Sequence, residues 1–103
     1  MQFAVFANAD GRTRDAVPYL LDVQSDLIAK AQTCVVVPII ALARAGRPID
    51  RLMPVFAFGG GEWVMDTLQL AGVPRRTLGA PVADLTAERT RILAALDMLV
   101  SGI

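Results

Sequence analysis

The chain of 103 residues contains no histidine and one cysteine, and these shortages exclude several common kinds of site. Without histidine, the chain cannot form a Ser-His-Asp triad, a Cys-His pair or an imidazole-bound metal centre. A single cysteine allows neither an internal disulfide nor a thiolate zinc site. Cys34 lies in an apolar run and is interpreted as a small hydrophobic residue of a strand. We therefore expect no metal site.

Net charge and long apolar runs are missing too. The ten basic and ten acidic residues cancel, so no overall field attracts the protein to nucleic acid. No run approaches the roughly eighteen apolar residues of a membrane span, and the first ten residues do not have the pattern of a signal peptide. We therefore expect a cytoplasmic protein that makes no membrane contact.

Apolar residues, in contrast, make up 54% of the chain, which is a high share for so small a protein. A chain of this length forms one modest core, so residues 1–103 are expected to be a single domain. We also expect part of the apolar surface to be buried against a second copy or another partner.

Short apolar runs separated by turn residues predict a mainly β protein that ends in one helix. Residues 39–45 could add one or two turns of helix, and residues 79–81 (GAP) are expected to break the pattern. Such an order of elements is typical of a small barrel or folded sheet closed by a C-terminal helix. Strands are predicted over residues 2–8, 19–24, 33–38, 53–58, 62–68 and 73–78.

The final helix is predicted over residues 84–103, with Thr86 as its N-cap. Gly102 stands where a helix could end, and the chain finishes on an apolar residue. Two interpretations remain open for this end: it docks on the body of the protein, or it is exposed for a partner. The apolar stripe at helical spacing consists of Ile92, Ala95, Leu96, Leu99, Val100 and Ile103.

Three other features are interpreted as structural or left open. Residues 59–61 (GGG) lack the lysine and hydroxyl residue of a phosphate-binding loop and predict a hairpin turn. Trp63 is expected in the core, with its indole N–H bound to a carbonyl. Arg75 and Arg76 could bind phosphate, or could protect an edge strand from aggregation.

Acidic residues do not form a convincing cluster in the sequence. Asp22, Asp26 and Asp84 are scattered and are interpreted as solvated loop residues. One of these loops also contains two aliphatic residues, Leu27 and Ile28, directly after a serine and an aspartate. Aliphatic residues are unusual in a loop of this kind, and they have no structural explanation at this level.

Several segments together resemble a known family. The most specific are residues 1–3 (MQF), 22–28 (DVQSDLI) and 101–103 (SGI). Shorter matches are Val37-Pro38, Pro54, Trp63, Val73-Pro74 and residues 82–85 (VADL). With these segments, the chain resembles the CcdB family of bacterial toxins over its whole length.

This resemblance implies a fold and a function. The fold would be an SH3-like β-barrel with a C-terminal helix, as in the CcdB, MazF and Kid toxins, and the protein would be a homodimer. It would be the toxin of a type II toxin–antitoxin pair, neutralised by the disordered segment of a small CcdA-like antitoxin. It would bind the A subunit of DNA gyrase and trap the cleaved complex, without a catalytic residue, a cofactor or nucleic-acid binding of its own.

The resemblance also implies where gyrase would bind and which anchor is missing. The family pattern has Phe-Trp before the terminal Gly-Ile, whereas this chain has Val100-Ser101. Loss of such an aromatic anchor weakens an interface by roughly 2–4 kcal/mol, so we expect weaker or differently tuned binding. The implied gyrase-binding residues are Ser25, Leu27, Ile28, Asp97, Val100, Ser101, Gly102 and Ile103.

Two alternatives stay open beside this prediction. MazF- and Kid-type toxins share the fold but cleave messenger RNA, using a basic groove with catalytic arginine and acidic or threonine residues. This neutral chain has no obvious matching set. The other alternative is a family member that kept the fold and lost its target.

Overall fold

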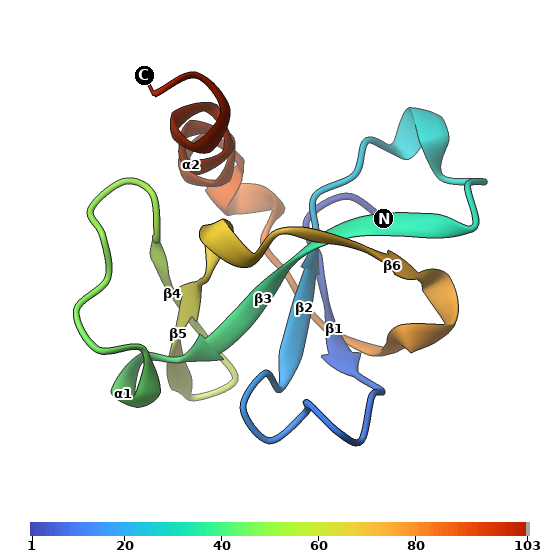
Figure 1. The fold of residues 1–103 in the computed structure, drawn as a ribbon, viewed down its shortest axis with the longest axis horizontal. Coiled ribbons are helices and arrows are strands. Elements are labelled where there is room, and N and C mark those ends of the chain that lie inside the picture. Colours follow the sequence, from blue (N-terminus) through green and yellow to red (C-terminus); the bar gives the residue numbers. More distant parts are fainter. Residues whose placement is uncertain (103) are drawn as a thin grey trace.

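The computed structural model describes residues 1–102, so Ile103 lies outside the described residues. Within that range the strands are β1 (Ala4–Asn8), β2 (Tyr19–Asp22), β3 (Thr33–Ala41), β4 (Val55–Phe58), β5 (Gly61–Met65), β6 (Ala71–Pro74) and β7 (Leu78–Asp84). The helices are α1 (Leu42–Ala45) and α2 (Arg89–Ser101), together with the 3-10 helices η1 (Asp26–Ile28), η2 (Thr67–Gln69), η3 (Arg75–Thr77) and η4 (Thr86–Glu88). Figure 1 shows α2 beside a strongly curled sheet.

The sheet curls because the long strand β3 changes partner along its length. The strand order is β4-β5-β3-β2-β1-β7, and all the pairings are antiparallel. In the first half of β3, Val36 pairs with Ala71 of β6, whereas further along Ile39 pairs with Met65 of β5. One strand therefore joins two differently directed parts of the sheet, which produces a half-barrel (Figure 1).

Strand β3 is buried on both faces, as its continuous β-branched sequence predicts. Val37 faces the main core, whereas Cys34 and Val36 pack with Leu20 on the other side. Cys34 is therefore a small hydrophobic strand residue, and this prediction is confirmed. The main core is formed by Phe3, Val5, Leu21, Val23, Val37, Ile39, Phe56, Met65, Leu85, Ile92 and Ala95.

The predicted fold class is confirmed: the protein is mainly β, with a curled antiparallel sheet and a C-terminal helix. The predicted helix over residues 39–45 is wrong for its first three residues. Ile39 to Ala41 continue β3, because they pair with Met65, Val64 and Trp63 of β5. Only Leu42–Ala45 are helical.

The expected break at residues 79–81 is also wrong, because these residues lie inside β7. Strand β7 is at the edge of the sheet, and its pairing with β1 contains register shifts, so Pro81 is tolerated there. Gly79 is needed for a close approach: a Cβ at this position would lie 2.8 Å from the carbonyl oxygen of Ala7. The strand predicted over residues 73–78 is replaced by the end of β6 and by η3.

The start of the final helix differs from the prediction as well. Thr86 lies in η4 and is not the N-cap, since α2 begins only at Arg89. The side chain of Asp84 binds the first residue of this turn, accepting hydrogen bonds from the Thr86 hydroxyl at 2.5 Å and the Thr86 amide at 2.9 Å. These bonds hold the pKa of the Asp84 carboxyl below its usual value.

Helix α2 is fixed to the sheet by its apolar stripe and by one arginine. Ile92 and Ala95 are fully buried, as predicted. Arg91 donates a hydrogen bond from Nη2 to the carbonyl oxygen of Val55 on β4 at 2.9 Å, and its guanidinium lies 4.9 Å from the centre of the Phe56 ring. The helix therefore closes one side of the half-barrel over the outer edge of β4.

Candidate binding loop and helix end

The loop between β2 and β3 presents two apolar side chains to solvent. Ser25 is the N-cap of η1, and its Oγ accepts a hydrogen bond from the amide of Leu27 at 3.2 Å. Leu27 is 95% exposed and Ile28 is 55% exposed. Aliphatic side chains with this much exposed surface are only partly stabilised by their own chain, so they mark this loop as a candidate contact surface.

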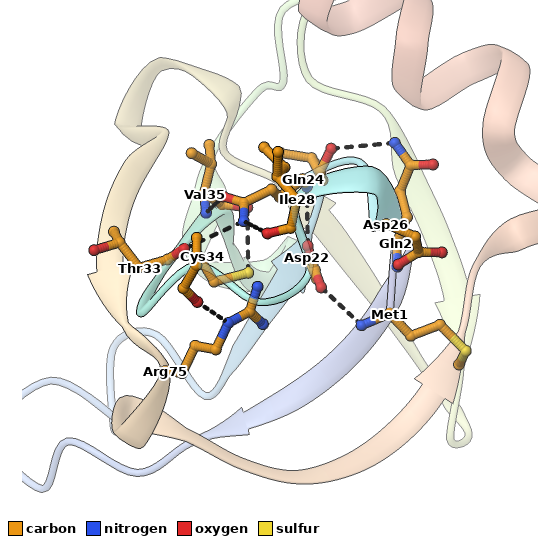
Figure 2. Close-up of polar contacts among 12 residues, drawn as sticks. Met1, Gln2, Asp22, Gln24, Asp26, Ile28, Thr33, Cys34, Val35 and Arg75 are labelled. Carbon is orange, nitrogen blue, oxygen red and sulfur yellow. Dashed lines mark hydrogen bonds and ion pairs between the residues drawn. The ribbon is translucent and has the colours of Figure 1, made fainter.

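Gln24 holds this loop from its base (Figure 2). The side chain of Gln24 is buried and makes three hydrogen bonds. Its Nε2 donates to the carbonyl oxygen of Ile28 at 3.1 Å and to that of Thr33 at 3.2 Å. Its Oε1 accepts from the amide of Val35 at 2.9 Å. One amide side chain thus connects the start of β3 to the end of η1.

The two aspartates of the same segment are also engaged in hydrogen bonds. Asp22 is buried, and its Oδ2 pairs with the α-ammonium group of Met1 at 3.0 Å, while its Oδ1 accepts from the amide of Gln24 at 2.9 Å. Asp26 is exposed, and its Oδ1 accepts from the amide of Gln2 at 2.9 Å. The interpretation of Asp22 as a solvated loop residue is therefore wrong, because its carboxylate is buried and paired with the α-ammonium group of Met1. This distant partner could not be identified from the local sequence.

The thiol at the foot of this loop is not reactive at neutral pH. Cys34 is fully buried, and this burial raises its pKa to about 11, with a further upward contribution from the neighbouring Asp22 carboxylate. Because the thiolate is the nucleophilic form, a thiol with so high a pKa is inert near pH 7. Cys34 has a packing role in this structure.

The end of α2 is the second candidate surface. Val100 is 85% exposed, and Asp97 is exposed as well. Ser101 donates a hydrogen bond from its hydroxyl to the carbonyl oxygen of Asp97 at 2.7 Å. Gly102 ends the helix with a left-handed φ of 76°, and its amide donates to the carbonyl oxygen of Met98 at 3.0 Å. Ile103, the last residue of the predicted site, lies outside the described residues.

The two candidate surfaces are separate within one chain. In Figure 1 the η1 loop (cyan) lies at the upper right and the end of α2 (red) lies at the upper left. The structure therefore brings Ser25, Leu27 and Ile28 together on the loop. It brings Asp97 to Gly102 together on the helix end, but it does not join the two groups into one patch.

Away from these surfaces, an open cleft of about 840 Å³ lies between α1 and the β4–β5 hairpin. Trp63 lines it, stacked on Phe58 and perpendicular to Tyr19, and its indole N–H donates to the carbonyl oxygen of Phe58 at 3.1 Å. The predicted indole–carbonyl bond is thus confirmed. The predicted hairpin turn is present at Gly59 and Gly60, both with positive φ angles, whereas Gly61 is already the first residue of β5 and pairs with Phe58.

Residues 1–102 contain neither a cluster of potential metal ligands nor a helix that could span a membrane. No group of three or more cysteine, aspartate or glutamate side chains is placed to bind a metal ion. No helix in this part of the chain is long and apolar enough to cross a membrane.

These features define a small β half-barrel with a C-terminal helix and an exposed apolar loop. A protein-family model described as CcdB protein matches residues 2–102. The chain therefore belongs to the CcdB family, and this membership supports a toxin of a toxin–antitoxin pair.

Proposed function

We propose that this protein is a toxin that binds the A subunit of DNA gyrase and traps the cleaved gyrase–DNA complex. The proposal is supported chiefly by the loop of η1. The family-specific segment, residues 22–28, forms the hydrogen bonds that hold Leu27 and Ile28 in the solvent. Family membership over residues 2–102 supports the same target.

Such a mechanism requires binding energy from the toxin and no chemistry, because gyrase itself cuts the DNA. Burying an aliphatic side chain contributes about 1.5–3 kcal/mol, and Leu27 is almost fully available for this. Val100 offers more apolar surface at the end of α2. A ligand that fits only the cleaved state of gyrase would shift the enzyme toward that state.

We further propose that the active form is a homodimer. Leu68 lies in η2 and is 55% exposed, and Leu70 directly follows η2 and is 37% exposed. This 3-10 helix contacts α2. An apolar face of this kind is suited to a two-fold interface, which would present two copies of the loop and two copies of the helix end. A CcdA-like antitoxin with a disordered segment would then neutralise the dimer.

The test is a cleavage assay with purified gyrase and supercoiled DNA, with and without ATP. We expect the protein to increase linear DNA released after denaturation of gyrase. The double variant Leu27→Ser and Ile28→Ser should lose this effect. The variant Ile49→Ser, which removes an exposed aliphatic residue elsewhere, should keep it. If the wild-type protein does not increase DNA cleavage by gyrase from the source organism, the proposal is overturned. Cleavage of messenger RNA by the protein would indicate a MazF- or Kid-type nuclease instead.

A further inference from the structure

The returning part of the η1 loop is held by a residue from a distant segment, Arg75. The Nε atom of Arg75 donates a hydrogen bond to the carbonyl oxygen of Ala31 at 2.6 Å. The backbone amide of the same residue donates to the carbonyl oxygen of Gln32 at 3.0 Å. Arg75 therefore makes two hydrogen bonds to consecutive residues of a loop that lies more than forty residues earlier in the chain.

These bonds extend the pairing of β6 with β3. The ladder between these strands ends where Thr33 pairs with Pro74. The next residue, Arg75, begins η3 and reaches past the ladder to the loop. Arg75 is thus not part of an edge strand, which was one of the two interpretations from sequence, and phosphate binding by Arg75 and Arg76 stays a prediction.

Gln24 and Arg75 hold different parts of the loop. Gln24 bonds to the carbonyl oxygens of Ile28 and Thr33 from inside the fold. Arg75 bonds to residues between these two points from the outside. Figure 2 shows Gln24 and Arg75 approaching the loop from different elements.

We propose that Arg75 is a positioning residue that fixes the η1 loop in the conformation presenting Leu27 and Ile28, and thereby increases its affinity for its partner. The affinity part of this inference rests on the proposed function. A loop already held in its bound conformation loses less conformational entropy on binding, so the complex is tighter without any new contact. Arg75 acts through the loop backbone and is not itself assigned a contact with gyrase.

The first test measures the loop without any partner. Ile28, Ala29 and Ala31 each donate a backbone hydrogen bond within the loop, so the exchange of these amide hydrogens reports its opening. In the variant Arg75→Ala, we expect these amides to exchange about tenfold faster, while amides of the buried strand β3 keep their protection. Exchange would be followed by NMR.

A matched control is available at the next residue. Arg76 is exposed, and within residues 1–102 its side chain has no hydrogen bond to the loop. Arg76→Ala removes the same charge from η3 and should leave loop exchange unchanged. Arg75→Lys keeps a charged donor and should recover part of the protection. Equal loop exchange in Arg75→Ala and Arg76→Ala would overturn the inference.

The second test measures binding to the purified A subunit of gyrase by surface plasmon resonance. We expect Arg75→Ala to dissociate about five- to tenfold faster than Arg76→Ala, with similar association rates because both lack one positive charge. A loosened loop with unchanged dissociation would overturn the role of Arg75 in binding. Failure of the wild-type protein to bind would overturn the proposed function instead, and the exchange experiment would still decide whether Arg75 fixes the loop.

Discussion

Gln24 accepts a hydrogen bond from the backbone amide of Val35 at 2.9 Å, and through this bond the loop of η1 is anchored to β3, the long strand that joins the two parts of the sheet. The opposite end of the same amide group donates to two carbonyl oxygens. A single side chain therefore ties the position of the apolar loop to that of β3.

The variant Gln24→Glu separates these roles. A carboxylate still accepts from Val35, but it faces the carbonyl oxygens of Ile28 and Thr33 without a donor. We expect the free energy of unfolding to fall by about 1–3 kcal/mol, measured by urea denaturation. Gln32→Glu makes the same chemical change at an exposed position and should have little effect. Equal stability of both variants would contradict this account of Gln24.

Gly79 should not tolerate a side chain. In Gly79→Ala the added Cβ would lie 2.8 Å from the carbonyl oxygen of Ala7, and backbone atoms cannot easily move away. We expect a loss of about 1–3 kcal/mol, seen as a lower melting temperature. Gly11→Ala is the matched control, because a Cβ at this position meets no atom within 4 Å. An unchanged melting temperature for Gly79→Ala would show that β7 can shift away from β1.

Ser101 offers a way to restore the aromatic anchor of the family pattern. Ser101 is exposed, so a tryptophan fits there without disturbing the core. If gyrase is the target, Ser101→Trp should bind its A subunit at least about tenfold more tightly, because aromatic anchors contribute 2 kcal/mol or more at interfaces. Calorimetry measures the change. Ser101→Ala removes the hydroxyl and its hydrogen bond to Asp97 without adding an aromatic ring, so it should show no such gain in affinity.

Cys34 makes stability depend on pH in the alkaline range. The thiol has a pKa of about 11 in the folded protein and an ordinary value of 9.0, so the folded state holds its proton more firmly than the unfolded state. Its stabilising contribution is complete below pH 9 and is lost as the pH rises from 9 to about 11. Thermal unfolding of Cys34→Ala should lack this part of the pH dependence. Parallel curves for both proteins would contradict the assignment.

Much of the fold could be predicted from local patterns in the sequence. The β-branched run around Val36 predicts a strand buried on both faces, and the spacing of Ile92 and Ala95 predicts the buried side of α2. Glycine in residues 59–61 predicts the hairpin turn. These features depend on near neighbours, so the sequence contains the necessary information.

The errors involve residues whose environment is set by distant parts of the chain. Pro81 suggests a break until β7 is known to lie at the sheet edge. Asp22 is indistinguishable from a surface acid until Met1 is placed beside it. Arg75 gives no sign of its bond to Ala31 because the two residues are far apart in sequence. The sequence shows the two aliphatic residues of the loop, Leu27 and Ile28, but the hydrogen bonds that support them depend on the fold.

Arg91 has a consequence for solubility. Strand β4 ends the sheet on one side, and an unprotected sheet edge offers its backbone groups to strands of other molecules. The guanidinium of Arg91 donates a hydrogen bond to the carbonyl oxygen of Val55 at that edge. It thereby places a positive charge where an incoming strand would have to pair. The arginine thereby protects a small, strongly apolar chain from aggregation through pairing of β4 with strands of other molecules.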